Sequence, residues 1–516
     1  MNLGIDYGMT NTLAATVDKK ELRLCPISEG PIPSIPTIAA SSSDGKMSFG
    51  YKAKLLAKKI GTKMLKGLKS RMYKPEDDSA IGIPREENST AVTGFLSTIL
   101  NTVKRVEGES IEKVCIGVPE VWLSTKEGYN ARTELKKALE PLFEQSEDNK
   151  LELISEAIAV SSYYAYLSDK KEDNLLIVDA GGSTIDIALV RYSKVSTEED
   201  ELGLDIELIK RSGSDVAGVK YIEEVVRLVC GIDEVDYNIY SEMEENIIAS
   251  TEEIAFFNSV GNNENDVVFT FTMDDHREIP VTMSILKKAF DSVIKPKLDD
   301  AINEVLIGEK NATFEFAPAG GFSEFPILRS YLERKVNSTA NVLCSPKNAR
   351  PAVAYGLALI ADGKVRIETK APYTLGFVGL LGDDAVCTCI CVNKNESIRA
   401  GTLYYACLPV NEVGRQKVPA IFTGSKISNF YLAFDTDAPV KGIAPKGNYE
   451  EKLRLCGKHP FRLAVSFDQS SSIILHVENI DYLSNHIIST NDIYIDDIYD
   501  VLGYNMHLLN ATDYKC

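Results

Sequence analysis

Residues 175–186 read LLIVDAGGSTID, an apolar run that ends in Asp179 and passes through a glycine-rich turn into a second apolar run. Residues 3–12 read LGIDYGMTNT and show the same order of strand, aspartate, turn and strand about 170 residues earlier. Glycine lets backbone approach a ligand closely, and turn N–H groups beside hydroxyl side chains form a concave set of donors for phosphate oxygens. One such turn is most often a plain β-hairpin. Two of them predict a pair of α/β lobes that hold a phosphate-bearing ligand from opposite sides.

A third glycine pair, Gly320 and Gly321, follows the apolar run 316–319. We expect this backbone to lie against a ribose or an adenine. The phosphate-loop pattern GxxxxGK[ST] and the dinucleotide pattern GxGxxG do not occur in the sequence. Those two common routes to nucleotide binding are therefore excluded.

The composition is that of a globular protein, with 44% apolar and 25% charged residues. The length of 516 residues corresponds to about three domains. The formal net charge of -19 repels phosphate backbones and anionic lipid, so we expect neither nucleic acid nor a membrane as a partner. No apolar run reaches the ~18 residues of a membrane-spanning helix, and the N-terminus has no secretory signal, which predicts a cytoplasmic protein.

The pattern of apolar and polar residues along the sequence predicts its domain organisation. Mixed α/β patterning extends to about residue 364, and short alternating apolar and polar runs separated by turn residues follow from about 371. The predicted fold class is α/β, two lobes followed by a small all-β sandwich. The expected segments are lobe I at 1–168, lobe II with a return helix at 174–364, a linker at 365–370, the β-sandwich at 371–492, and a short tail at 493–516 that could form one helix.

These motifs, in their order, resemble those of the 70-kDa heat-shock protein (chaperone) family, within the actin, sugar-kinase and heat-shock ATPase superfamily. The matching stretches of the predicted lobes are 4–12, 118–119, 154–157, 179–186, 320–321 and 352–356. Residues 371–376, 465–468 and 474–477 are similar to parts of the family's peptide-binding β domain. The resemblance implies an actin-like ATPase fold, ATP or ADP with Mg²⁺ as ligands, and unfolded peptide or a dedicated protein partner, with a co-chaperone or exchange factor as a further partner.

The resemblance also implies roles for single residues near the phosphates. Asp6 and Asp179 would hold Mg²⁺ through water, and Lys54 would reach the γ-phosphate. Asp186 and Glu156 would order the metal shell or the attacking water. The phosphate contacts would come from the two turns, through Gly8, Thr10, Asn11, Gly181, Gly182, Ser183 and Thr184.

Two of these roles have plain alternatives. Lys54 lies among Lys52, Lys58 and Lys59 and could be one more solvated surface charge. Glu156 could only cap the apolar helix that follows it. The arrangement is nevertheless coherent, because a cation stabilises charge on a transferred phosphoryl group while carboxylates position metal and water.

The sequence departs from the family pattern in several places. Glu324 stands where the family has an arginine that stacks on the base, and Ala255 stands where it has a lysine. The apolar linker of the family carries charges here, at 365–369, and about 24 residues after the β domain are too few for a long helical lid. These changes leave the base preference and the coupling between domains open.

Leu375, Phe377 and Leu380 align with positions that line the family's peptide pocket, but they could equally be ordinary sandwich core. The leading functional hypothesis is a divergent, lidless, chaperone-like ATPase. The alternative is a weak or inactive ATPase that acts as a regulatory or assembly subunit for one protein partner. A small-molecule kinase is the least favoured hypothesis, because the residues after 371 form a β module.

Overall fold

The structure is a computed structural model of the 516-residue chain. It divides into two compact units, Met1–Arg366 and Ile367–Cys516, and the division falls within strand β16 (Val365–Lys370). The description covers the chain except residues 29–32, 57–58, 60, 74–84, 125, 144–149, 197–201, 233–234, 236, 261–264, 274–275, 309–313, 337–348, 372–373, 382–384, 394–395, 408–417, 423–426, 434–459, 469–472, 482, 485 and 496–516.

The first sheet of unit 1 has the strand order β3-β2-β1-β8-β9. Its strands are β1 (Asn2–Tyr7), β2 (Asn11–Asp18), β3 (Glu21–Leu24), β8 (Lys113–Val118) and β9 (Lys150–Ser155). Alternation along β1 buries Leu3, Ile5 and Tyr7 in one core with α3 (Arg85–Glu107) and α5 (Lys126–Leu139). We call this sheet with its helices the first lobe.

A small sheet of order β6-β5-β7 extends the first lobe. It contains β5 (Ala39–Ser41), β6 (Met47–Phe49) and β7 (Lys63–Leu65), while β4 (Ser34–Pro36) pairs with β2. The short helices α1 (Gly50–Leu56) and α2 (Leu68–Tyr73) flank β7 in the chain, and α4 (Glu120–Ser124) follows β8. These pieces carry several of the charged side chains that matter below.

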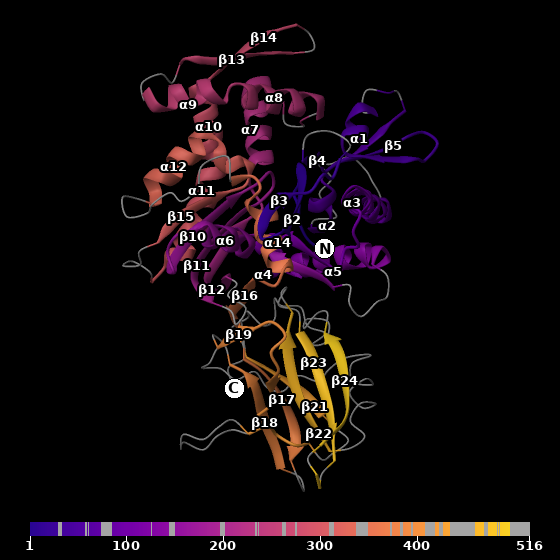
Figure 1. The fold of residues 1–516 in the computed structure, drawn as a ribbon. Helices are drawn as coiled ribbons and strands as arrows, with labels where there is room; N and C mark the ends of the chain where they lie inside the picture. Colours follow the sequence, from indigo (N-terminus) through magenta and orange to yellow (C-terminus); the bar gives the residue numbers. More distant parts are fainter. Residues whose placement is uncertain are drawn as a thin grey trace. The chain divides into compact units, whose positions relative to one another are not determined.

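The second sheet of unit 1 includes the consecutive strands β15-β10-β11-β12 and has a core of its own. Its strands are β10 (Glu172–Ala180), β11 (Ile185–Ser196), β12 (Leu202–Ser214) and β15 (Glu315–Ala319). β10 is antiparallel to β11 and parallel to β15, just as β1 is antiparallel to β2 and parallel to β8. The repeated motif in the sequence is therefore a repeated arrangement in space, and this sheet with its helices is the second lobe (Figure 1). The fold is a two-lobed, actin-like α/β architecture followed by a β domain, as predicted.

Helices α6 (Glu156–Leu167) and α14 (Ala352–Ala361) pack closely against each other and are almost entirely buried. A Cβ at Gly356 would lie 1.7 Å from the carbonyl oxygen of Ala159, and a Cβ at Gly4 would lie 2.3 Å from the backbone nitrogen of Ala358. Only glycine permits these approaches. Together they hold β1, and with it the first turn, against the helical layer.

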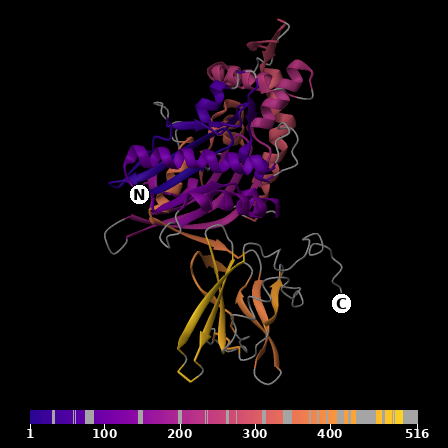
Figure 2. The same ribbon diagram turned by 90° about the vertical axis from the view of Figure 1, so that its right-hand side faces the viewer.

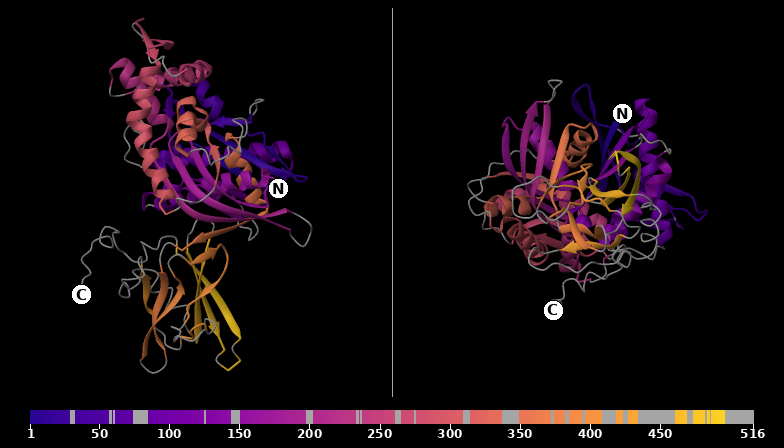
Figure 3. Two further views of the ribbon diagram at one scale, coloured as in Figure 1. Left: turned by 90° about the vertical axis from the view of Figure 1, so that its left-hand side faces the viewer. Right: turned by 90° about the horizontal axis from the view of Figure 1, so that it is seen from below.

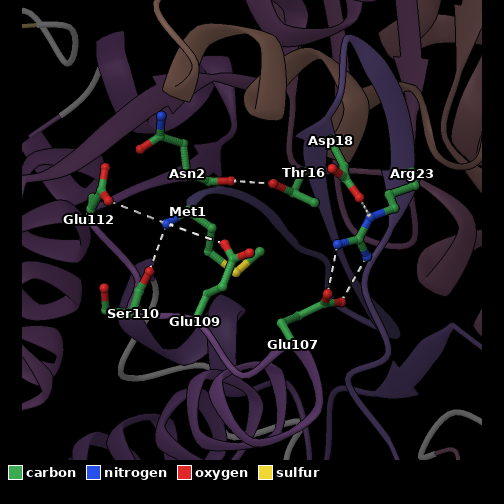
Figure 4. A network of polar contacts seen from close by, with 9 residues as sticks. All are labelled: Met1, Asn2, Thr16, Asp18, Arg23, Glu107, Glu109, Ser110 and Glu112. Atoms are coloured by element: carbon green, nitrogen blue, oxygen red, sulfur yellow. Dashed lines mark hydrogen bonds and ion pairs between the residues drawn. The ribbon is translucent and has the colours of Figure 1, made fainter.

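The N-terminal hairpin is fixed to α3 and the loop after it by polar contacts (Figure 4). The α-amino group of Met1 donates to the Ser110 carbonyl over 2.7 Å. The Arg23 guanidinium donates two hydrogen bonds, of 2.8 and 2.6 Å, to the Glu107 carboxylate. The Thr16 hydroxyl donates to the Asn2 carbonyl over 2.7 Å and links β2 to β1. The strands that carry the first turn are thus fastened at the end away from it.

The second lobe has a helical layer beyond its sheet. It contains α7 (Gly218–Cys230), α8 (Tyr237–Ala249), α9 (Thr251–Val260), α10 (Met283–Ala289), η2 (Phe290–Ile294), α11 (Lys295–Leu306), η3 (Gly321–Glu324) and α12 (Pro326–Val336). α10, the π-helical turn η2 and α11 form one uninterrupted helical run, which is the long salmon helix in Figure 3. The hairpin β13 (Val267–Thr272) and β14 (Glu278–Thr282) lies beside α8 and α9.

Unit 2 is a β domain of two facing sheets, orange and yellow in Figure 2. One sheet has the order β18-β17-β21 and the other β20-β22-β23-β24. The strands are β17 (Thr374–Leu381), β18 (Ala385–Val392), β19 (Ser397–Arg399), β20 (Tyr404–Tyr405), β21 (Ile427–Ala433), β22 (Phe461–Phe467), β23 (Ile473–Ile480) and β24 (Ile487–Ile495). A cross-strand chain links Ser466 to His476 and His476 to Asp492, each over 2.7 Å.

Three sequence expectations need comment here. The segment expected as a linker forms strand β16, whose last residues pair with β19. Strand β24 continues to Ile495, past the expected end of the sandwich at 492, and the rest of the expected C-terminal helix lies outside the described residues. Within the part of the chain that the structure describes, no helix combines the length and the apolar character needed to cross a bilayer.

Candidate functional site

The two aspartate-tipped turns face each other within unit 1. A Cβ at Gly182 would lie 3.1 Å from Cγ2 of Thr10 and 3.7 Å from Cβ of Met9, so the second turn rests directly against the first. The Gly181 N–H donates to the Thr184 carbonyl over 2.9 Å and closes the second turn, and the Thr37 N–H donates to the Thr10 carbonyl over 2.9 Å. Residues 172 positions apart in the chain, Thr10 and Gly182, are thereby neighbours.

The aspartates at the ends of β1 and β10 share one electrostatic environment. Burial, followed by the nearby Glu156 carboxylate, raises the pKa of Asp6 to about 7, while Lys69 pulls it down. Burial also raises the pKa of Asp179 well above its ordinary value, and the carboxylates of Glu156 and Asp6 add to the rise. Asp179 therefore feels Asp6, and both aspartates feel the same glutamate and lysine. This is the convergence that the repeated motif predicted.

Asp186 and Glu120 form the next layer of buried carboxylates. The Glu120 N–H donates to Oδ1 of Asp186 over 2.8 Å. Burial and the Glu156 and Glu120 carboxylates raise the pKa of Asp186 well above its ordinary value, and burial raises the pKa of Glu120. Arg211 approaches Oε2 of Glu120 to 3.4 Å and partly offsets this charge. The site thus concentrates carboxyl groups where water has been excluded, and burial favours their neutral forms.

Lys69 is the cation at the centre of this site. It is only 4% exposed, and its Nζ donates to Oε1 of Glu156 over 2.5 Å. The same Nζ lies 5.9 Å from the ring centre of Tyr7 and 5.7 Å from that of Trp122. Sequence reasoning missed this residue. The available signal was a lysine between the apolar positions Leu68 and Met72 of a short helix, where a solvated charge is not expected.

Lys54 lies elsewhere. It is on α1, its side chain is 53% exposed, and its Nζ makes a 3.4 Å ion pair with Oε1 of Glu245 on α8. The structure places Lys69, and not Lys54, beside the buried carboxylates, because α2 enters the first lobe's core whereas this face of α1 meets solvent. Glu156 does not serve merely as a cap. The cap of α6 is Ser155, whose hydroxyl accepts from the Ile158 N–H over 3.1 Å, while the Glu156 side chain bonds Lys69.

The third glycine pair adjoins the second turn. Gly320 has a φ of +76°, and a Cβ there would lie 2.4 Å from both Oδ1 of Asp179 and the Ala180 carbonyl oxygen, so only glycine fits. Gly321 opens into free space, since a Cβ there would meet nothing within 4 Å. Residues 320–321 therefore run past the carboxylate that the second turn presents.

A guanidinium does lie near this loop, although it comes from an unexpected segment. Nε of Arg350 donates to Oε2 of Glu324 over 3.1 Å, and the Arg350 side chain is 66% exposed. Burial raises the pKa of Glu324, and Arg350 lowers it. The Gly320 N–H contacts the Ala349 carbonyl at 3.4 Å, which fixes the residue before Arg350 to the glycine pair. The sequence comparison had shown only that Glu324 replaced an arginine.

The remaining predicted residues fall into two groups. Gly8, Asn11, Ser183 and Thr184 lie on or beside the two facing turns. Leu375 and Phe377 are buried in the core of unit 2, which favours the core alternative, and the Leu380 side chain lies outside the described part. Among the described residues, no group of three or more histidine, cysteine or carboxylate side chains is arranged to hold a metal ion.

Comparison with known proteins adds to this geometry. No protein-family model matches the chain. The chain is 23% identical to the chaperone protein DnaK of Endomicrobium trichonymphae over 404 residues, which cover 72% of this chain and 60% of that protein. It is 23% identical to DnaK of Methanothermobacter thermautotrophicus over 402 residues, covering 74% of this chain and 63% of the relative. With DnaK of Thermotoga petrophila it is 21% identical over 507 residues, covering 93% and 78%.

The chain is similar to DnaK chaperones of the 70-kDa heat-shock protein family, at 21–23% identity. The alignments with the first of these DnaK relatives span only about 60% of the relatives' length. The structure brings the two turns together, with Thr10 of the first lobe beside Gly182 of the second and Asp6 close enough to Asp179 to raise its pKa. The chain departs from the family pattern at Glu324, which pairs with Arg350, and along strand β16, which carries charges.

Proposed function

We propose that unit 1 binds Mg-ATP between the two facing turns and hydrolyses it, as a divergent chaperone-type ATPase. The observation that supports this most directly is the contact between Thr10 and Gly182 beside Asp6, Asp179 and the Lys69–Glu156 pair. Turn N–H groups and hydroxyls from both lobes suit phosphate oxygens, and buried carboxylates suit a divalent cation.

The donor set fits a polyphosphate and a magnesium ion that is held through water rather than by three or more direct protein ligands. Four carboxylate side chains, of Asp179, Asp186, Glu120 and Glu156, are nine-tenths buried or more, and Asp6 adjoins them. Lys69 and Arg211 supply fewer positive charges than these carboxylates supply negative ones. Asp6 and Asp179 would hold the ion through water, and bound Mg²⁺ would neutralise phosphate charge.

The chain's own residues have distinct tasks in this proposal. Thr10, Asn11, Ser183 and Thr184 bind phosphate oxygens from the two turns. Lys69 stabilises negative charge on the phosphoryl group, and Glu156 holds the Lys69 ammonium in place. Asp186, fixed by the Glu120 N–H, orients a water molecule. Arg350 lies where a guanidinium could contact the base, with Glu324 as its anchor.

For unit 2 we propose engagement of an extended peptide or of a dedicated protein partner, with a co-chaperone or exchange factor acting on unit 1. The proposal rests on the family resemblance of the β domain. Because Leu375 and Phe377 belong to the core, they are not the residues that would contact a peptide. The missing family lysine at Ala255 and the charged segment 365–369 favour one alternative, a slow or inactive ATPase that regulates a single partner.

The test is a comparison of nucleotide binding and Mg-dependent ATP hydrolysis in the purified full chain and its variants. Lys69→Ala and Thr184→Ala should each lower the rate of hydrolysis by about 100-fold or more, the cost of losing a charge-stabilising group. Lys54→Ala should change it less than about threefold, the cost of one exposed ion pair. Lys69→Ala leaves the buried Glu156 carboxylate without its ion-pair partner, which destabilises the fold. The double variant Lys69→Gln with Glu156→Gln therefore serves as a second test, because it removes both charges together.

Hydrolysis that survives both Lys69→Ala and Thr184→Ala would contradict the proposed site. Loss of hydrolysis in Lys54→Ala alone would restore the role that the sequence first suggested for that lysine. Nucleotide binding without turnover in the unchanged protein would support the regulatory alternative.

A further inference from the structure

A pocket lies on the helical layer of the second lobe, at residues that the proposed nucleotide site does not use. It has a volume of about 440 Å³ and is lined by α9, the continuous run α10–η2–α11, and α12. Phe290 and Ile327, both buried, form its apolar lining, and the Tyr331 ring packs edge-on against Phe290 with centres 5.4 Å apart. This volume is in the range of small-molecule sites.

The pocket is positively charged in an acidic protein. Four cations line it, Lys287, Lys295, Arg334 and Lys335, against one lining acid, Asp291. The formal charge of the whole chain is -19. A concave surface whose sign opposes that of its surroundings focuses the field on ligands of the opposite charge, here anions.

Two of the four cations are already neutralised. Nζ of Lys335 lies 2.8 Å from Oδ1 of Asp299, and Nζ of Lys295 lies 3.5 Å from Oδ1 of Asp291. Among the residues that the structure describes, neither Lys287 nor Arg334 has an acidic partner. These two therefore remain to bind an anion from opposite walls, since Lys287 is on α10 and Arg334 on α12.

The π-helical turn explains why the cations of one wall converge. In an uninterrupted α-helix, eight residues advance about 80° beyond two full turns, so Lys287 and Lys295 would diverge. The Lys295 N–H instead bonds the Phe290 carbonyl five residues earlier, and this wider turn reduces the rotation per residue. Lys287, Asp291 and Lys295 consequently all line the pocket. Single π turns within helices are frequent at functional sites.

We propose that this pocket binds a small organic phosphate. Lys287 and the guanidinium fork of Arg334 contact the phosphate oxygens, because a guanidinium matches tetrahedral oxyanions with paired N–H donors. Tyr331, over whose ring Nζ of Lys295 lies at 5.8 Å, packs against the organic part of the ligand. The Asn258 amide lies at the rim, fixed by hydrogen bonds to the Pro326 carbonyl and the Ser330 hydroxyl.

The test uses the full chain and glucose 6-phosphate as the probe, with glucose as the uncharged control, and measures binding by titration calorimetry with and without saturating Mg-ADP. We expect saturable binding with a Kd near 1 mM, of about -4 kcal/mol, that Mg-ADP leaves unchanged. Glucose should not bind. The salt dependence should be steep, because the contact is ionic.

Variants of the lining residues test whether the phosphate probe binds at this pocket. Lys287→Ala combined with Arg334→Ala should weaken binding about tenfold or more, because charged hydrogen bonds are lost. Lys288→Ala, the neighbouring exposed lysine on α10 outside the pocket lining, should bind like the unchanged protein. Arg334→Lys should give an intermediate affinity, since it keeps the charge and loses the fork. Thermal unfolding checks that each variant is folded.

Three results would overturn the proposal. The first is the absence of saturable binding by the unchanged protein. The second is equal affinity in the double variant and in Lys288→Ala. The third is binding of a polyglutamate peptide without binding of the phosphate probe, which would make the pocket a contact for an acidic protein segment. None of these results depends on whether the chain hydrolyses ATP, because the titrations without nucleotide measure binding to this pocket by themselves.

Discussion

The two aspartate hairpins share a motif but use glycine for different reasons. In the first hairpin a Cβ at Gly8 would lie 2.3 Å from the carbonyl oxygen of Asn11, so glycine is needed to form the turn itself. In the second hairpin a Cβ at Gly181 would have its nearest neighbour at 3.6 Å, whereas a Cβ at Gly182 would lie 3.1 Å from Cγ2 of Thr10 in the other lobe. The first turn depends on its own backbone and the second on its partner. The same sequence pattern thus encodes a local constraint in one lobe and a constraint between lobes in the other.

The supports of the two hairpins differ as well. The first hairpin is fastened by surface and half-buried polar contacts, such as Arg23 with Glu107. The second hairpin is held by longer strands and by Gly320, which lies so close to it that an added Cβ would be 2.4 Å from Oδ1 of Asp179. We therefore expect the second hairpin to be the less tolerant of change.

The largest expected effect is at Gly182. Gly182→Val would force a branched side chain into the space that Thr10 occupies, and overpacking of this kind costs ~1–3 kcal/mol. Nucleotide affinity, measured by titration calorimetry, should fall by about 10-fold to 100-fold. Gly182→Ala should lose less, and adding Thr10→Ser, which removes the Cγ2 in contact, should restore part of that loss. Unchanged affinity in Gly182→Val would show that the turns do not approach each other in solution.

The carboxylates give a second effect, in the pH dependence of stability without metal or nucleotide. The pKa of Asp6 is about 7 in the folded chain against an ordinary value of 3.8, so the folded state binds a proton that the unfolded state releases between these values. Stability should therefore be greatest at low pH within this window and decline as the pH rises to about 7, by at most about 1.4 kcal/mol per pH unit for each such group. Urea unfolding in EDTA from pH 5 to 8 measures the slope.

Asp6→Asn and Asp179→Asn should each flatten this slope, because burial raises the pKa of both aspartates. A chain whose stability instead rises with pH over the same window would show that the two carboxylates are not desolvated together. The comparison of the two variants ranks the hairpins by how strongly each buries its charge.

Arg350 gives the third effect, confined to the base end beside the second hairpin. Arg350→Ala should lower ATP affinity about threefold to tenfold, through loss of a cation beside the base, and leave pyrophosphate affinity unchanged. Exchanging the charges with Glu324→Arg and Arg350→Glu should recover most of the ATP affinity. Equal losses for ATP and pyrophosphate would mean that Arg350 acts on the phosphates or on the fold.

The smallest effect concerns the support of the first hairpin. Arg23→Met should lower the free energy of unfolding by no more than about 1 kcal/mol, because the Arg23 side chain is 37% exposed and water partly screens its charge. Glu107→Gln should match it, and the double variant should show that the two losses are not additive. A loss of several kcal/mol would show that the first hairpin depends on this contact far more than its exposure indicates.

Local patterns were sufficient to predict the strand–aspartate–glycine motifs, the two lobes and the β domain. They failed where a role depends on which face of an element is buried. Lys54 and Lys69 are both lysines on short helices, and only the packing of α2 against the core shows that Lys69 reaches Glu156. Arg350 escaped notice for a similar reason, since it meets Glu324 across a gap of 26 residues. Leu375 and Phe377 read equally well as groove or core, and the second sheet of unit 2 covers them.

The amino-acid order alone determined that this chain forms two aspartate-tipped glycine turns, because a strand, an aspartate and a glycine turn are properties of ten or so consecutive residues. Tertiary structure decided which cation joins them, why Gly182 must lack a side chain, and how a π turn gathers lysines into a pocket on another face. The physical reason is the distance along the chain over which each interaction acts. Backbone conformation follows from neighbours in the chain, whereas burial, charge pairing and steric exclusion follow from neighbours in space.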